Sequence, residues 1–428
     1  MGVLLTRIHL VEATTRSEAG WVAAVAVTWG LGVHLGRLPR LGWGVMLGAL
    51  ALRCALVGTP PLLSDDLYRY LWEGQALNIG GNPYLAAPET FAATHAKAVA
   101  KVNHPELTSI YPPLAMLWFR FLAWSGDSST WVQFCTVLVD LGNILLLAKL
   151  GSLHSKDSRC ATLYALHPIP ILACAVGGHI DTLALLMALC ACASMRGMTA
   201  SAWTLAGALT KLLPGALMIF WIRRHGWRSL FLGAIPVVLI STAATGGAIW
   251  EAGLTSLDSL TLFTHHWSFN GLVYPWLATL SPHSARPLLT GLWLCGVTMV
   301  ALRASQPLTV LGAVGGGLLI CSPTVHPWYL LWAFGPLCVL AGRAATLPLS
   351  FLLGSYAVLF TLQDSGDWAE PSWLWLITWT PTLLSAAYLS RPIRPESETQ
   401  AYPQAYKIKN GKPHQSLSAT ATPHAPDR

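Results

Sequence analysis

The sequence predicts an all-α integral membrane protein that crosses the bilayer many times. Of its 428 residues, 54% are hydrophobic, only 11% are charged and 20 are tryptophan. The mean hydropathy is +0.51, and these values together lie well outside the range of soluble proteins. Backbone groups in lipid must be hydrogen-bonded within the chain, which an open sheet cannot do at its edges. The spanning segments are therefore expected to be helices.

Apolar runs suited to membrane spans, which need roughly 17–25 residues each, recur along the whole chain. They occur near 20–36, 41–58, 130–149, 159–176, 180–195, 228–250, 285–303, 307–321, 326–341, 345–362 and 371–389. Shorter or interrupted candidates lie at 112–124 and 199–222. The sequence thus predicts about 11–13 spans.

Basic residues indicate which side of the membrane is cytoplasmic. By the positive-inside rule, the internal side is marked by Arg37, Arg40, Arg196, Arg223, Arg224, Arg228, Arg303, Arg343, Arg391 and Arg394. Segments 59–111 and 251–284 then face outward. This pattern explains the formal charge of +7 better than nucleic-acid binding does. We expect a multi-pass protein of the plasma (inner) membrane with an extracytoplasmic active site.

Two stretches do not fit a simple alternation of spans. Segments 112–124 and 130–149 together connect an external loop to a basic loop at 149–159 that should be internal. Either 112–124 is only partly inserted or the basic loop breaks the rule. The 199–222 run lies between internal arginines and contains Lys211 and Pro214. A broken or re-entrant helix would reconcile these features.

One long polar segment, residues 64–113, interrupts the apolar chain. It carries five of the 19 acidic residues and directly follows an apolar run, so it should lie at the membrane surface. Asp65 and Asp66 are adjacent there, and their mutual repulsion with partial desolvation should raise the pKa of one of them. Such a carboxylate could accept a proton near neutral pH. The segment is the first candidate for an active site.

Five motifs together resemble a known family. They are SDDLYRYLWEG, GGNPY, NHPELTSIYPP, GGHID and SPTVHPWYLL, in this order across roughly residues 60–340. They are similar to landmarks of the multi-spanning GT-C glycosyltransferases, above all the bacterial polyprenyl-phosphomannose-dependent α-mannosyltransferases. The resemblance implies a catalytic acid in the first external loop, a lipid-phosphate sugar donor and an inverting single displacement. Glu73 stands in LWEG where the family more often has LWDG, a departure that bears on substrate specificity.

The resemblance implies that Asp66 is the catalytic base. In related enzymes the acid immediately precedes an apolar residue, which maps onto Asp66-Leu67. Transfer of a sugar to a hydroxyl requires a base for the acceptor proton. Asp65 is the second candidate, orienting the acceptor or capping a helix. The alternative is that Ser-Asp-Asp only begins a helix, with acidic residues favouring its dipole, and the two interpretations are compatible.

Arg69, Lys211 and His326 are expected to hold the donor phosphate, because a departing phosphate anion needs fixed cations or hydrogen-bond donors. An unpaired lysine within an apolar run is costly in lipid and indicates function, unless Lys211 extends to the interface. His326 resembles the histidine of the loop that contacts the donor phosphate in the family. An interfacial aromatic belt is the alternative explanation for the rest of HPWY.

Further residues are expected to bind the sugar or the acceptor, although structural packing is an alternative for each alone. Aromatic faces can stack on pyranose C–H groups while hydroxyl groups donate hydrogen bonds. His179 and Asp181 are two residues apart and supply too few ligands for a metal. The expected substrate-binding residues are Tyr68, Tyr70, Glu73, Asn82, Tyr84, His104, Tyr111, His179, Asp181, His266, Asn270, Trp328 and Tyr329.

No metal site and no cofactor besides the lipid-linked donor are expected. The nine cysteines lie in or beside apolar runs and form no CxxC pair, so a zinc site or a disulfide framework is not indicated. In the family, a donor without pyrophosphate removes the usual need for a metal. The expected partners are membrane lipid, a polyprenyl-phosphate sugar and a lipid-linked or glycan acceptor. The oligomeric state stays open.

The chain is expected to comprise a transmembrane domain, 1–390, with its catalytic loop at 59–111, and a disordered cytoplasmic tail, 391–428. The main alternative function is a transporter or flippase of a lipid-linked sugar. Such a protein would carry charges throughout its spans and an inverted repeat, whereas here the acids cluster outside them. A membrane transferase that uses another lipid-linked sugar is the second alternative.

Overall fold

The computed structural model describes residue 25 and residues 28–33, 38–154, 157–359 and 370–390. Every regular element among them is a helix, and the strand-like contact there is an isolated bridge that joins Phe269 and Asn270 to Thr324. This confirms the all-α fold. The chain divides into one compact unit, Met1–Ser390, and a second unit, Arg391–Arg428. The second unit, and with it the expected tail, lies outside the described residues.

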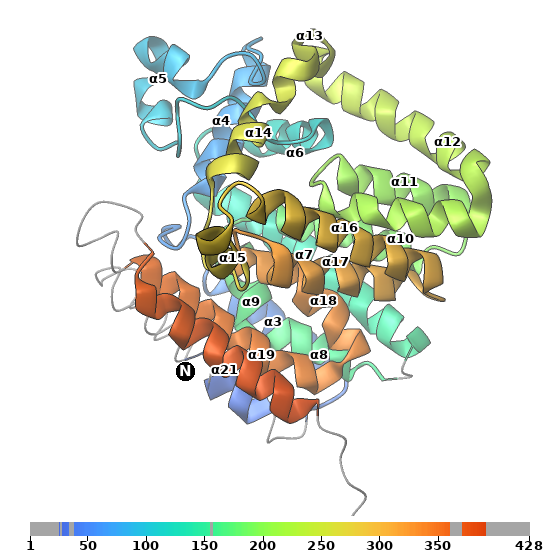
Figure 1. The fold of residues 1–428 in the computed structure, drawn as a ribbon. Helices are drawn as coiled ribbons and strands as arrows, with labels where there is room; N and C mark the ends of the chain where they lie inside the picture. The colour runs from blue at the N-terminus through green and yellow to red at the C-terminus, as the bar shows by residue number, and fades with distance from the viewer. Residues whose placement is uncertain (1–24, 26–27, 34–37, 155–156, 360–369, 391–428) are drawn as a thin grey trace, which may run out of the picture. The chain divides into compact units, whose positions relative to one another are not determined.

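The polar segment forms its own helices at one end of the compact unit. After α3 (Trp43–Cys54) come α4 (Asp66–Asn78), η1 (Pro88–Phe91), α5 (Ala92–Val99), α6 (Pro113–Ala123) and α7 (Ser129–His154). Figure 1 shows α4, α5 and α6 gathered at this end. Gly74 allows α4 to approach α6 closely, because a Cβ there would overlap the carbonyl of Phe119.

The lengths of α6 and α7 bear on the ambiguous stretch at 112–159. The 11 residues of α6 rise about 16 Å, which is half of the roughly 30 Å hydrocarbon core. The 26 residues of α7 rise about 39 Å. One full-length helix therefore connects the polar end to the basic loop, which favours partial insertion for 112–124.

The middle of the chain contains a bent and a broken helix. Its elements are α8 (Arg159–Leu166), α9 (Pro168–Ile171), the π-helical η2 (Leu172–Val176), α10 (Asp181–Ala193), α11 (Gly197–Ala208), η3 (Leu213–Ala216) and α12 (Leu217–Thr245). The chain bends by 52° at the break between α8 and α9, where Pro168 cannot continue the helix. The break expected within 199–222 is confirmed, and Lys211 lies in it. A second interruption falls within α12 at Gly226, whose φ is 76°.

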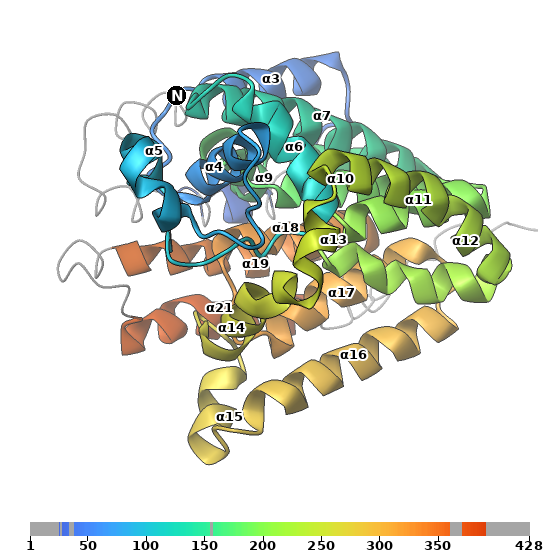
Figure 2. The ribbon, with the colours of Figure 1, turned by 90° about the horizontal axis from the view of Figure 1, so that it is seen from above.

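The last third of the chain consists of α-helices and short 3-10 helices. Its elements are α13 (Ala248–Ala252), η4 (Gly253–Leu257), α14 (Asp258–His266), α15 (Tyr274–Leu280), α16 (Ala285–Arg303), α17 (Pro307–Cys321), η5 (Pro327–Tyr329), α18 (Leu330–Leu340), η6 (Gly342–Ala345), α19 (Thr346–Leu352), η7 (Leu353–Ala357) and α21 (Ser372–Leu389). The runs expected at 285–303 and 307–321 coincide with α16 and α17. Seen from above, α15 and α16 lie along one edge and α3 along the opposite one (Figure 2).

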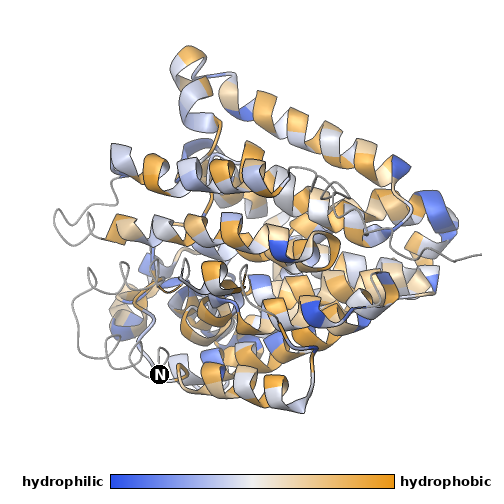
Figure 3. Ribbon diagram, turned by 90° about the horizontal axis from the view of Figure 1, so that it is seen from below, coloured by the Kyte–Doolittle hydropathy of each residue, from blue (hydrophilic) through white to orange (hydrophobic). Residues whose placement is uncertain are grey.

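The helices have the lengths and apolar surfaces of a polytopic membrane protein. Three helical stretches among the described residues, Ser129–His154, Leu213–Thr245 and Ala285–Arg303, are long and apolar enough to cross a membrane, and Arg159–Val176 is a further, bent candidate. Five shorter apolar helices accompany them, so the total of 11–13 spans stays a prediction. Apolar residues extend over the outward faces of the helices (Figure 3), including Phe231 and Leu239, which are 75% and 65% exposed.

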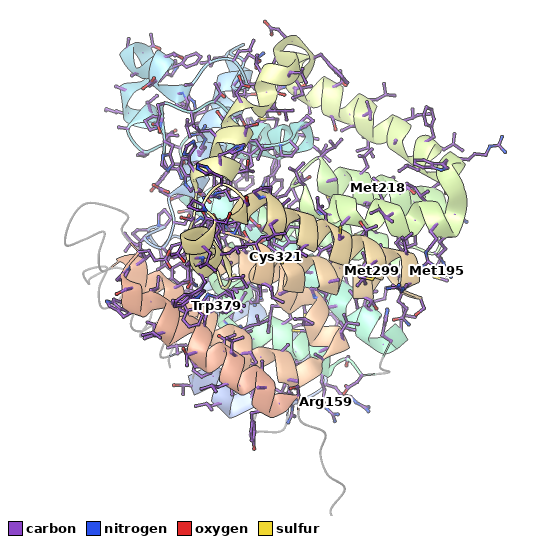
Figure 4. All side chains as sticks on the ribbon, in the orientation of Figure 1. Arg159, Met195, Met218, Met299, Cys321 and Trp379 are labelled. Carbon is purple, nitrogen blue, oxygen red and sulfur yellow. The ribbon has the colours of Figure 1, made fainter. Side chains whose placement is uncertain are left out.

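Three of the basic segments, around Arg196, Arg223 and Arg303, meet at one end of the bundle. Arg223 donates a hydrogen bond to the carbonyl of Ala304, next to Arg303, and Gly197 packs against His225 and Ser229. Figure 4 places Met195, which precedes Arg196, at the same end as Met299. This clustering agrees with the topology that the basic residues predict.

Candidate active site

The first carboxylates of the site stand at the start of α4. Asp66 is the first residue of this helix, and Asp65 occupies its N-cap position without a side-chain capping bond. The Oγ of Ser64 lies 3.4 Å from the backbone N of Asp66, which makes a weak cap. Asp66 also places its charge at the favourable end of the helix dipole. The structural interpretation of Ser-Asp-Asp thus explains part of the motif and leaves both carboxylates available for other contacts.

Asn103, from the loop after α5, joins the two carboxylates. Its Nδ2 lies 2.9 Å from Oδ1 of Asp65 and 2.9 Å from Oδ1 of Asp66. The other carboxylate oxygen of Asp66 lies 3.5 Å from Nδ1 of His179, and the Asp66 side chain is 21% exposed. Asp66 therefore has one oxygen fixed by an amide and one oxygen beside an imidazole.

The two carboxylates differ in pKa. Asp65 retains contact with solvent, but the surrounding protein and then the charge of Asp66 raise its pKa, against the effect of the Asn103 hydrogen bond. Burial would raise the pKa of Asp66 as well, but the contact with His179 and the charges of His326 and Lys211 outweigh it and lower the pKa to about 2. One raised pKa was expected from the adjacent pair, and it belongs to Asp65 rather than to the candidate base Asp66.

Three aromatic rings connect the GGHID and HPWY motifs. The Trp328 ring lies between His179 and His326, with centroid distances of 4.1 and 4.5 Å and interplanar angles of 17° and 6°. The glycines of GGHID make this stack fit. A Cβ at Gly177 would collide with the His179 ring, and Gly178 has a φ of +60° and would meet Cγ1 of Val132 at 2.9 Å.

Lys211 is paired, contrary to expectation. Its Nζ lies 2.6 Å from Oδ2 of Asp181 and 4.8 Å from the centre of the Tyr329 ring. The second oxygen of Asp181 accepts a hydrogen bond from Nε1 of Trp332 at 2.7 Å. Asp181 is fully buried and anchors Lys211, and its expected contact with the sugar stays a prediction. The Lys211 side chain remains 22% exposed and can still meet an anion.

Arg69 does not fit the expected role in phosphate binding. A guanidinium has five N–H donors, and the five hydrogen bonds of Arg69 go to Oε1 of Glu73 and to the carbonyls of Asn103, His104, Leu107 and Thr108. Glu73 uses its other oxygen to accept from Ser109 and is 1% exposed, and its expected contact with substrate stays a prediction. Arg69 and Glu73 fix the 103–109 loop over α4.

The remaining expected substrate residues divide by their exposure. Tyr70 stacks on Phe119, the Tyr84 hydroxyl donates to the Tyr111 carbonyl, and both are at most 2% exposed. Asn82 bonds Glu251 and the carbonyl of Ala248. These contacts hold the three side chains within the fold, and their expected contacts with substrate stay predictions. Solvent reaches Tyr68, His104, Tyr111 and His266.

Asn270 is held by several hydrogen bonds within the fold. It is fully buried, has a φ of 49°, and its side-chain oxygen accepts from Thr378 while its carbonyl accepts from Trp379. Its backbone N–H donates to Glu370. These bonds tie the loop before α15 to α21, and the expected contact of Asn270 with the acceptor stays a prediction.

Sequence reasoning did not select Asn103 or Trp332 as site residues. Asn103 was within the NHPELTSIYPP motif, and an amide in a motif beside paired carboxylates was a usable signal. Trp332 had no such signal, because its partner Asp181 is 151 positions away in the chain. Among the described residues, no three His, Cys, Asp or Glu side chains are gathered to hold a metal ion.

Comparison with known proteins identifies two matching regions. Residues 4–223 match the family "Alpha-(1->6)-mannopyranosyltransferase, N-terminal domain", and residues 279–391 match the "MptB C-terminal domain". A protein of Mycolicibacterium smegmatis, described as a probable alpha-(1->6)-mannopyranosyltransferase, is 26% identical over an alignment that covers 94% of this chain and 84% of that protein. The first region contains the two carboxylates, Asn103, His179 and Lys211, and the second contains His326 and Trp328.

Proposed function

The chain belongs to the α-(1→6)-mannopyranosyltransferase family, and on this basis we propose that it moves a mannosyl or related hexosyl unit from a polyprenyl-phosphate sugar to a hydroxyl of a lipid or glycan acceptor. Membership of the family makes it a membrane glycosyltransferase, and the GT-C type is part of the proposal. In the proposal the active site faces the outside of the plasma (inner) membrane. The donor lipid, the acceptor and the membrane lipid are its partners.

The observation that carries the proposal is the convergence of a carboxylate, a lysine and a histidine on one aromatic stack. Asp66 contacts His179, His179 stacks on Trp328, and Trp328 stacks on His326. Lys211 lies over Tyr329, whose ring contacts that of His326. A base for the acceptor and donors for an anion therefore lie together at the polar end, as transfer from a lipid phosphate requires.

The proposed reaction is a single displacement at the anomeric carbon. The acceptor oxygen attacks this carbon while its proton passes to Oδ2 of Asp66, and the bond from the carbon to the phosphate oxygen breaks. Polyprenyl phosphate leaves with the electron pair, and Lys211 and His326 stabilise its developing charge. Inversion means that an α-linked product, the linkage named for the M. smegmatis relative, requires a β-linked donor.

The direct test is transfer of radiolabelled mannose from synthetic β-polyprenyl-phosphomannose to membrane lipid extract by purified protein, with and without chelator. Asp66→Asn should reduce the rate by about 10²–10⁴-fold, the usual contribution of a general base, while Asp65→Asn retains more activity. The donor's α-anomer should not react. We expect chelator to leave the rate unchanged, since the proposed chemistry uses no metal.

The outcomes separate the alternatives. Full activity of Asp66→Asn with loss in Asp65→Asn would assign the base to Asp65. Absence of transfer by the wild-type protein, tested with several lipid-linked sugars, would contradict the proposed reaction. Movement of labelled donor across sealed vesicles without transfer would instead support a flippase.

A further inference from the structure

Asn103 uses one amide nitrogen for two carboxylates. The nitrogen of a primary amide carries two donor hydrogens, and each has a carboxylate oxygen at 2.9 Å, Oδ1 of Asp65 and Oδ1 of Asp66. The contacts themselves define the orientation of the amide, because its oxygen could not donate to either carboxylate. Oδ2 of Asp66 is left beside His179.

The loop that carries Asn103 is fixed to the same helix as the carboxylates. Arg69, three residues after Asp66 on α4, donates to the carbonyl of Asn103 and to that of His104, each at 2.9 Å. His104 has a φ of 46°, which turns the chain so that both carbonyls face the guanidinium. The amide and the carboxylates thus share one rigid frame, and the rotamer of Asp66 is set from outside its own helix.

A neutral amide has a specific advantage at this position. Two adjacent negative charges repel one another, and a cation at position 103 would offset that repulsion but would also weaken the basicity of both carboxylates. An amide bridges them without adding charge. It also binds one oxygen of each carboxylate, Oδ1 of Asp65 and Oδ1 of Asp66. Oδ2 of Asp66 is left for another partner.

We propose that Asn103 is a positioning residue that holds Asp66 with its Oδ2 directed at the acceptor hydroxyl and makes the two adjacent carboxylates functionally unequal. The inference rests on the proposed transfer reaction, because the acceptor is defined by it. Asn103 itself does not exchange a proton with the substrate.

The first test is the kinetics of Asn103→Ala, with Asn78→Ala as the control. Asn78 lies on α4, is exposed and accepts a hydrogen bond from Arg120, so its loss should change neither kcat nor the pH profile. Asn103→Ala should reduce kcat by about 10–100-fold, the scale of a small misplacement of a catalytic group, with KM for the donor nearly unchanged. The acid limb of the pH profile should move to higher pH, because a lost hydrogen bond destabilises the ionised carboxylates.

Two more variants keep the test specific. Asn103→Asp removes the donors and adds a negative charge, so it should lower kcat further and move the acid limb further up. Asn103→Gln retains the amide and should recover part of the rate; it also replaces the alanine variant if that variant does not fold. The other groups that face the pair, His104, His179, Lys211 and His326, are the same in all variants.

An infrared titration of protein with ¹³C-labelled aspartate carboxyls tests the inference without any transfer assay. Bands missing in Asp65→Asn and Asp66→Asn assign the two side chains, and in Asn103→Ala the Asp65 band should protonate at higher pH than in wild type. If wild type transfers mannose but Asn103→Ala leaves the rate and both titrations unchanged, the inference is overturned. If the wild-type protein transfers no mannose but the Asp65 titration shifts in Asn103→Ala, the proposed function fails. The inference that Asn103 makes the two carboxylates unequal is then still supported.

Discussion

At the scale of single residues, Arg69 shows how one side chain can hold a whole loop. Its guanidinium donates hydrogen bonds to four carbonyls of the 103–108 segment and to the carboxylate of Glu73. Carbonyls that lose such a partner in a buried site remain without hydrogen bonds, which costs free energy. The arginine thus organises the backbone around the candidate active site, and in the proposed reaction Lys211 and His326 hold the donor phosphate.

Replacing Arg69 should therefore affect stability before it affects donor binding. Arg69→Gln leaves Glu73 buried without its cation and should lower the free energy of unfolding by about 3–5 kcal/mol. It should also speed hydrogen exchange of the amides at 103–108. Arg159→Gln, which breaks an exposed pair with Asp157, is the control and should cost at most about 1 kcal/mol. If Arg69→Gln leaves the stability unchanged but weakens donor binding, Arg69 would instead be assigned to the donor-phosphate site.

At the scale of helices, glycines decide how closely neighbours approach. A Cβ at Gly315 would overlap the backbone of Trp332, whereas a Cβ at Gly316 meets no atom within 4 Å. Gly315 thus marks the point where α17 packs closely against α18. Trp332 donates to Asp181, so this packing surface lies directly behind the anchor of Lys211.

Gly315→Ala and Gly316→Ala form a matched pair of variants. Gly315→Ala should lower the free energy of unfolding by about 1–3 kcal/mol through overpacking. Gly316→Ala should be neutral or raise it by about 0.5–1 kcal/mol, because alanine favours a helix interior. Denaturation in detergent micelles measures both. Equal effects at the two positions would show that α17 and α18 are free to separate.

The sequence predicted the elements better than the contacts between them. The bounds of α16 and α17 follow from apolar runs that end at Arg303 and begin at Pro307, because charge and proline interrupt a membrane helix. The break near Lys211 was visible for the same reason. The pairing of Lys211 with Asp181 was not, since 30 residues separate them and only the packing of α10 on α11 brings them together. The bonds of Arg69 were also hidden, because backbone carbonyls have no signature in a sequence.

At the scale of the whole molecule, the distribution of charge and of polar loops gives the protein two distinct ends. The basic segments around Arg196, Arg223 and Arg303 meet at one end, where Arg223 donates a hydrogen bond to the carbonyl of Ala304. Asp65, Asp66 and the loop after α5 lie at the other end of the molecule. The active site is therefore expected on the opposite side of the membrane from the arginines.

Cysteine labelling in whole cells tests this orientation. In a background with the exposed Cys54 and Cys295 replaced by serine, Leu254→Cys should react with a membrane-impermeant maleimide. Met195→Cys should react only after permeabilisation. The two native side chains are 83% and 89% exposed, so a difference in labelling reflects the side of the membrane. The reverse pattern would place the site in the cytoplasm.

The ring stack of His179, Trp328 and His326 has a consequence for how this gene can vary. One ring is encoded in the first matched region and the other two in the second, so recombination between relatives at a point from 223 to 279 would join rings that were selected in different proteins. A hybrid of this kind would inherit Asp65, Asp66 and Lys211 from one parent, and Trp328 and His326 from the other. The two regions are therefore expected to be inherited together.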